Sequence, residues 1–171
     1  MLSVVVFIMD GPAAPLSAEA VVRTLSSLVP AAVEGVVRDV TLAAPAGRAG
    51  MRKIADHAGC ELVEAGSQPA MFRRAFETVR NPNIFVIRAG RAPEQGFAEE
   101  LADLLAGGVQ SAIMRETPRR FMTRILPGLA PVAGLVARRD PMLRTQAHTL
   151  GDLVRNARAT TTLRARARFV E

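Results

Sequence analysis

Apolar side chains in this sequence fall into short continuous runs and into longer segments where they recur every three or four residues. The continuous, β-branched runs are typical of buried strands, and they predict strands over residues 2–8, 36–43, 60–63 and 84–87. The periodic segments predict amphipathic helices over residues 17–29, 51–57, 69–80 and 93–106. Pro30 is expected to stop the first of these helices, and Gly59 to end the second. Because strands alternate with helices, we expect an α/β three-layer sandwich with a mostly parallel, Rossmann-like central sheet.

The pattern beyond residue 108 is less regular. It predicts a strand over 109–114, a short basic helix over 118–125, an apolar segment over 131–137, helices over 140–147 and 150–158, and an exposed final strand over 160–170. A length of 171 residues suits one domain with a buried core. We therefore expect a single domain over 1–171, made of a regular half (1–108) and a less regular half (109–171).

The loops after the first, second and fourth predicted strands are the places to look for a site. Open α/β sheets bind ligands beyond the carboxyl ends of their parallel strands. Those ends lead into residues 8–16, 44–50 and 88–94.

Six stretches follow one another along the chain in a characteristic order: LSVVV (2–6), VRDVTLAA (37–44), IADHAGC (54–60), IFVI (84–87), LVRNAR (153–158) and LRARA (163–167). Taken together, they resemble family-2 glycosyltransferases in a shortened form with degenerate motifs. The resemblance implies an A-type nucleotide-sugar transferase fold, a nucleotide-sugar donor, and magnesium or manganese as cofactor. It also implies a nucleotide-binding half over 1–108 and an acceptor-side half over 109–171.

The acidic residues of that family are largely replaced in this chain. Alanine stands at 44 and 49, where the resemblance places acids that contact the nucleotide. Gly90 falls where the metal-binding aspartate would be. Since magnesium and manganese need hard oxygen ligands, the cofactor stays unknown and no metal ligand is assigned.

Four residues near these strand ends are candidates for binding a nucleotide or its phosphates: Asp10, Arg48, Arg88 and Arg91. Arginine suits phosphate because its planar group donates two parallel hydrogen bonds. Each candidate also has a structural interpretation. Asp10 lies in an Asp-Gly-Pro turn sequence, Arg48 is an ordinary loop arginine, and Arg88 and Arg91 could be surface charges where a strand ends.

Asp152 is the one candidate for a catalytic residue. In the resemblance the catalytic acid pair falls on Thr149 and Leu150, so that only Asp152 remains nearby. It lies one helical turn from His148 and could pair with it. At the start of a helix, an aspartate also has a structural role in favouring the helix dipole.

The positive charge behind the net charge of +6 comes almost entirely from arginine, which fits either a compositional bias toward arginine or an anionic partner. A nucleotide sugar and an anionic membrane surface both fit. Nucleic acid is disfavoured because the chain has no Trp or Tyr to stack on bases. Cys60 is the single cysteine, which excludes an internal disulfide. The first apolar run lacks a preceding basic residue and is expected to be a strand, not a signal peptide, which favours a cytoplasmic protein, alone or at the inner membrane face.

Three functions remain open from the sequence. The chain could transfer a sugar from a nucleotide sugar to an acceptor hydroxyl. It could be a non-catalytic relative that binds or regulates. It could also be a basic module that docks on an anionic membrane or partner. Fold does not choose between them, because function depends on the site.

Overall fold

The first apolar run forms strand β1 (Leu2–Phe7), and every one of its side chains is buried. The computed structural model describes residues 1–9, 16–108, 111–118, 125–144, 146–159 and 161–171. The other strands are β2 (Val37–Pro45), β3 (Glu61–Ala65), β4 (Asn83–Arg88), β5 (Arg91–Pro93), β6 (Ala112–Arg115), β7 (Val132–Arg138), β8 (Thr161–Thr162) and β9 (Ala167–Phe169). The helices are α1 (Ala18–Ser26), α2 (Val29–Val33), α3 (Met51–Ala58), α4 (Gln68–Thr78), α5 (Phe97–Ala106), α7 (Arg139–Leu143) and α8 (Leu150–Ala157), with a 3₁₀ turn at Pro127–Leu129.

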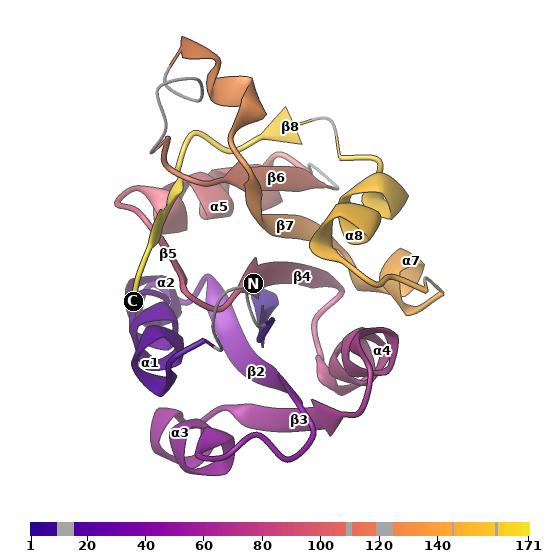
Figure 1. The fold of residues 1–171 in the computed structure, drawn as a ribbon. Helices are drawn as coiled ribbons and strands as arrows, with labels where there is room; N and C mark the ends of the chain where they lie inside the picture. Colours follow the sequence, from indigo (N-terminus) through magenta and orange to yellow (C-terminus); the bar gives the residue numbers. More distant parts are fainter. Residues whose placement is uncertain (10–15, 109–110, 119–124, 145, 160) are drawn as a thin grey trace.

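Seven strands form one central sheet in the order β3-β2-β1-β4-β7-β6-β8 (Figure 1). Strands β1 to β4 pair in parallel, and β6 pairs in parallel with β8. Only β7 runs the other way, antiparallel to both β4 and β6. The predicted mostly parallel sheet is confirmed, and strands from both halves of the chain contribute to it.

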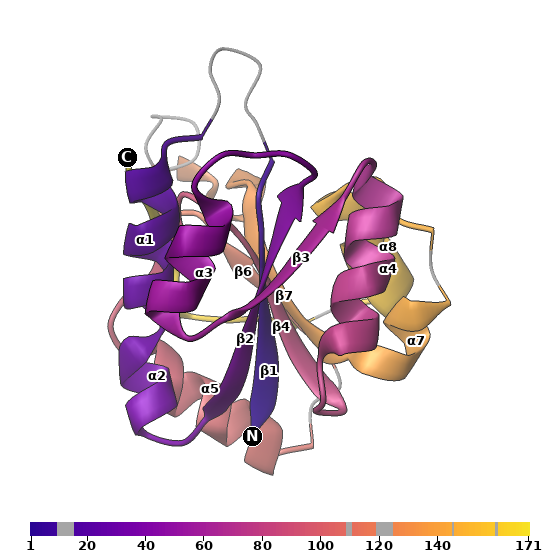
Figure 2. The same cartoon turned by 90° about the horizontal axis from the view of Figure 1, so that it is seen from below.

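Helices cover both faces of this sheet and make three layers (Figure 2). One core lies under α1, α2, α3 and α5, and includes Val21, Leu28 and Leu101. The other lies under α4, α7 and α8, and includes Phe72 and Leu153. Alternate side chains of β1 and β4 enter opposite cores, which is why both strands are continuously apolar in sequence.

A buried polar network joins β1, β2 and the turn before β4 at the amino-terminal edge of the sheet. The Ser3 hydroxyl donates to an Asp39 carboxylate oxygen at 2.9 Å. The Asn81 side-chain amide donates to both, at 2.9 Å and 3.0 Å. Because Ser3 is fully buried, these bonds satisfy a hydroxyl that would otherwise oppose folding.

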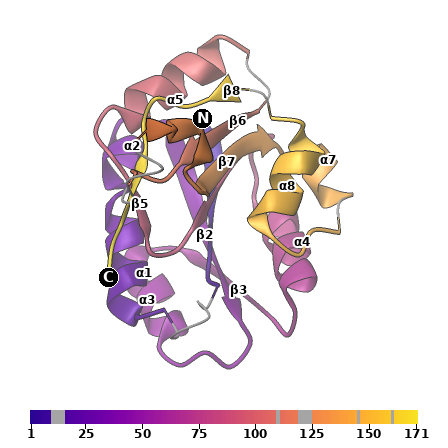
Figure 3. The ribbon, with the colours of Figure 1, turned by 45° about the horizontal axis from the view of Figure 1, so that its top comes forward.

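Two predicted elements before residue 108 differ from the structure. The helix expected over 17–29 is two helices, and Pro30 lies inside the second instead of stopping the first. Proline is tolerated there because the first turn of a helix has no partner for its N–H. The helix expected from Pro93 begins at Phe97, since Arg91–Pro93 forms β5 and pairs with β9 (Figure 3).

Three predictions in the second half also need comment. The helix expected over 140–147 is only Arg139–Leu143. The final segment is not one exposed strand but two short strands, with Leu163, Ala167 and Val170 buried. The carboxylate of Glu100 accepts from the backbone amides of residues 164 and 165, and so holds the segment between β8 and β9. The basic helix expected over 118–125 falls mostly on residues outside the described ranges.

Within the described residues, none of the helices combines the length and apolar character needed to cross a bilayer.

Gly134 gives a test of the packing at the centre of the sheet. A methyl group on its Cα would lie 2.7 Å from Cε2 of Phe85 and 3.1 Å from the Val86 carbonyl oxygen. The Phe85 ring is fully buried and packs on Phe97 with 4.9 Å between centroids, so it has little room to move.

We expect Gly134→Ala to lower the free energy of unfolding by about 1–3 kcal/mol, as overpacking of a core does. Urea unfolding followed by circular dichroism measures this, since the chain has no Trp or Tyr to report by fluorescence. Gly66→Ala is the control, because nothing lies within 4 Å of a Cβ there. Equal unfolding midpoints for the two variants would contradict the tight contact.

Candidate functional site

The candidate site lies at the carboxyl edge of the sheet, where β4 ends and the chain turns through Ala89 and Gly90 into β5. Arg88 is the last residue of β4, and Arg91 is the first of β5. β1 ends beside them, because the Ala89 amide donates to the Phe7 carbonyl at 2.9 Å. The sequence therefore locates the arginine pair correctly at a strand end of the predicted kind.

Gly90 is enclosed on several sides. Its amide donates to the Thr24 hydroxyl of α1 at 2.9 Å, and its carbonyl accepts from the Val170 amide at 3.1 Å. Its φ of +82° is one that glycine adopts without strain. An added Cβ would lie 2.9 Å from a methyl carbon of Leu16. A residue other than glycine would therefore be strained in its backbone at this position, and its Cβ would be too close to Leu16.

Arg91 is held in place by its neighbours. Its Nε lies 2.5 Å from Oε1 of Glu116, and both side chains are largely buried. Its guanidinium lies 4.4 Å from the centre of the Phe169 ring, and one terminal nitrogen donates to the Gly90 carbonyl at 3.0 Å. These contacts tie β5 to the segment after β6 and to β9, and the proposed contact of Arg91 with a phosphate stays a prediction.

Arg88 is half-buried and has a different environment. The pKa of its guanidinium is lowered, first by burial and then by the nearby charge of Arg91, while Glu116 opposes the shift. Among the described residues, none forms a hydrogen bond or an ion pair with the guanidinium group of Arg88. Glu116 is already paired with Arg91. Positive charge is therefore in excess here, and an added anion would relieve it.

Arg48 lies in the loop after β2 and donates to the backbone carbonyl of Leu16. Leu16 also contacts the Gly90 position, so this bond connects the loop to the same edge. At least one of its guanidinium donors is thus used to hold the chain before α1. Asp10 lies outside the described residues, and its proposed nucleotide contact stays a prediction.

Asp152 caps helix α8. One of its carboxylate oxygens accepts from the backbone amides of His148 at 3.0 Å and Thr149 at 2.9 Å, while the Thr149 hydroxyl accepts from the Asp152 amide at 3.1 Å. This is a capping box. The other oxygen pairs with Arg155 one turn along. The contact of Asp152 with His148 is thus made with the backbone amide and not, as expected, with the side chain.

The structure brings Arg88 and Arg91 together, and ties Arg48 to them through Leu16. No described contact joins Asp152 to them. The residues that enclose this edge were missed from sequence: Leu16, Thr24, Glu116, Phe169 and Val170. Nothing in a single sequence indicates that β9 returns to β5, because the pairing joins residues far apart along the chain.

The residues at this edge do not fit the magnesium or manganese that the resemblance implies. Gly90 offers no side-chain oxygen, Arg88 and Arg91 are cations, and the carboxylate of Glu116 is paired with Arg91. In the described ranges, there is no group of three or more His, Cys, Asp or Glu side chains arranged to hold a metal ion. We therefore derive no step that depends on a metal.

Several solved structures share this fold. Glucosyl-3-phosphoglycerate synthase from Mycobacterium tuberculosis, in complex with Mn²⁺, uridine diphosphate and phosphoglyceric acid, matches with a TM-score of 0.58 and 16% identity over 81% of this chain. This chain spans 56% of that one. A mycobacterial protein matches at 0.60 with 15% identity, over 98% of this chain and 64% of the other. HddC from Yersinia pseudotuberculosis, complexed with GMP-PN, matches at 0.60 with 7% identity, over 98% and 92%.

No protein-family model matches the chain, and no curated protein matches it significantly. At these identities the structural likeness concerns the fold alone. The chain has the α/β fold of A-type nucleotide-sugar transferases, and the predicted fold class is confirmed.

The Asp152 cap makes a prediction about pH. The backbone amide of His148 and the side chain of Thr149 are the leading causes that lower the pKa of its carboxyl group. A lowered pKa in the folded state means that the ionised carboxylate stabilises the fold above the unfolded pKa of about 3.9. That contribution is lost as the pH falls through the folded pKa.

We expect Asp152→Asn to be less stable than the parent at pH 7, and the difference to vanish in strongly acid solution. Urea unfolding followed by circular dichroism across a pH series measures the difference. Asp56→Asn is the control, because Asp56 is an exposed aspartate on α3. A stability difference that stays constant down to the acid limit would rule out the charged cap.

Proposed function

We propose that this chain binds a nucleoside diphosphate, or a nucleotide sugar, at the carboxyl edge of its sheet without a divalent metal, and that it does not transfer the sugar. The observation that carries the proposal is Arg88, a half-buried guanidinium with excess positive charge beside it. The fold places this charge where parallel sheets receive ligands.

The closure of Gly90 supports the loss of transfer. In the resembled family this position carries an acid that holds the metal against the diphosphate. Here Leu16, Thr24 and Val170 surround the glycine. A diphosphate leaving group would have to be neutralised by other charges, and Arg88 is the group suited to that task.

The environment of Asp152 also favours binding over catalysis. A base that activates an acceptor hydroxyl has to take up its proton. Asp152 is stabilised as a carboxylate by the hydrogen bonds that lower its pKa, and those bonds use it as a helix cap. In the proposed role, the half over 109–171 completes the fold and encloses the nucleotide edge.

The structural neighbours suggest the ligands to test. One is described with uridine diphosphate and another with GMP-PN. We expect uridine diphosphate, guanosine diphosphate or UDP-glucose to bind in isothermal calorimetry with an affinity that is the same in EDTA and in Mn²⁺. Binding should weaken as salt is raised, because salt screens the attraction between the anionic ligand and a guanidinium that is only half-buried.

Arg88→Gln should weaken this binding by about tenfold or more, since a charge-assisted hydrogen bond is worth about 1.5–3 kcal/mol. Arg73→Gln, an exposed arginine on α4, removes the same charge elsewhere and should leave binding unchanged. Binding that requires Mn²⁺, or that is lost equally in both variants, would contradict the site. Release of UDP from UDP-glucose during turnover would contradict the loss of transfer.

A second candidate function is docking on an anionic membrane, and a cluster of exposed apolar side chains favours it. Ile125, Leu126 and Leu129 are 59%, 51% and 62% exposed. In sequence they follow a run with three arginines, at 119, 120 and 124, which lie outside the described residues. Apolar and basic groups together are the composition that interfacial segments use.

Sedimentation with phosphatidylserine vesicles tests the membrane candidate. We expect the chain to pellet with these vesicles at low salt and not with neutral phosphatidylcholine vesicles. The double substitution Ile125→Ser with Leu129→Ser should release it, whereas Val33→Ser, another exposed apolar site at 80%, should not. Equal binding of both variants would exclude the cluster as the docking surface.

A further inference from the structure

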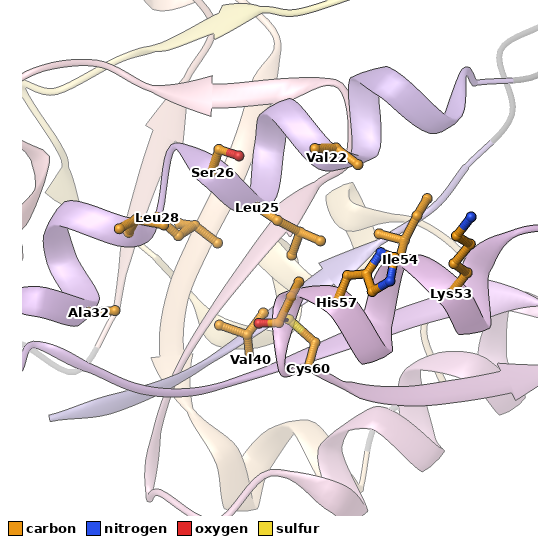
Figure 4. A pocket seen from close by; sticks show the side chains of 12 residues that line it. Val22, Leu25, Ser26, Leu28, Ala32, Val40, Lys53, Ile54, His57 and Cys60 are labelled. Atoms are coloured by element: carbon orange, nitrogen blue, oxygen red, sulfur yellow. Dashed lines mark hydrogen bonds between the residues drawn. The ribbon is translucent and has the colours of Figure 1, made fainter.

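A groove lies between helices α1, α2 and α3 (Figure 4), and its lining includes neither Arg88 nor Arg91. Its volume is about 600 Å³, within the range of small-ligand sites. Leu25 and Leu28 form one wall, Ile54 forms the other, and Val40 of β2 lies at its base. Burial raises the pKa of the Cys60 thiol, so this side chain adds a neutral surface to the lining.

The two ends of the groove differ in chemistry. Lys53 lies at one end with His57 next to it on α3, and Leu28 and Ala32 lie toward the other end (Figure 4). Lys53 is exposed, and no ion pair with it exists among the described residues. One end thus presents a cation, and the opposite end presents mainly apolar side chains, with the hydroxyl of Ser26 as an uncharged polar group among them.

Apolar side chains also border the groove on the solvent side. Val22 of α1 is 44% exposed, and Val29 of α2 is 54% exposed. Along α1 and α2 the fold therefore leaves apolar surface uncovered beside an apolar hollow. An occupant with a long apolar part would bury this surface, and the gain would grow with the number of its methylene groups.

We propose that this groove binds a single-chain carboxylate amphiphile of the fatty-acid class. The carboxylate lies near Lys53, and the chain runs past Leu25 and Val40 toward Ala32. The charge at one end selects an anion over a cation, while the apolar remainder selects a chain over a compact polar ligand. The ligand does not reach Arg88, so this inference is independent of the proposed nucleotide site.

Isothermal calorimetry with octanoate, decanoate and dodecanoate, each below its micelle concentration, tests the groove. Each added methylene should tighten binding by up to about fourfold, which corresponds to about 0.8 kcal/mol per buried CH₂, until the groove is filled. Decyltrimethylammonium should bind more weakly than decanoate, and decanol should lie between them. Affinity that ignores chain length, or a cation that binds as well as decanoate, would overturn the proposal.

Lys53→Glu tests the charged end. It should weaken decanoate binding by about three- to tenfold, as the reversal of an exposed charge contact does, and leave decanol unchanged. Arg52→Glu makes the same change in net charge on an exposed neighbour outside the lining, and should leave decanoate binding within about twofold. Equal losses in the two variants would show that net charge alone attracts the ligand, and would sink the assignment of Lys53.

Ala32→Phe tests the apolar end. The larger side chain fills the far end of the groove, so dodecanoate should lose its advantage over octanoate. Val33→Phe is the matched control, because Val33 is 80% exposed on the same helix and does not line the groove. Both positions are exposed, so thermal unfolding by circular dichroism should show that the two variants stay folded. An unchanged chain-length series in Ala32→Phe would place the ligand elsewhere.

Discussion

The pairing of β1 between β2 and β4 is the constraint on which the rest of the structure depends. β1 is buried on both faces and bonded along both edges, and five of its six residues contribute to the two cores. The register it sets determines where β2 and β4 end, and therefore where the loops of the candidate site begin. The network of Ser3, Asp39 and Asn81 holds the same three segments at the opposite edge of the sheet.

The regular half of the chain could be predicted from sequence because its strands and helices carry strong local signals. The apolar run of β4 and the glycine after α3 are examples, and the structure places both as expected. The short strands β5 and β9 could not be predicted, since each has only three residues and is defined by its partner. The expectation that Pro30 stops a helix was wrong, because proline breaks a helix only in its interior. Pro30 lies in the first turn of α2, where proline is accepted.

The position of the candidate site could be predicted from sequence better than the contacts that its individual residues make. Arg88 and Arg91 were expected at a strand end and lie there. Their difference in environment comes from Glu116 and Phe169, which reach them only in the folded chain. Asp152 shows the same limit: an aspartate near a helix start is compatible with a base or a cap, and its contacts with two backbone amides appear only in the folded chain.

The pairing of β5 with β9 has a consequence for how the site forms. β5 and Gly90 lie near the middle of the chain, yet their partners are residues 167–170. Contacts between such distant residues carry a loop-closure cost that is recovered only after the intervening chain is ordered. The first half of the sheet can pair through local crossovers, but the arginine edge takes shape only when the last strand returns to it. The arrangement of Arg88 and Arg91 at this edge therefore depends on residues 167–170, which are more than 70 positions away along the chain.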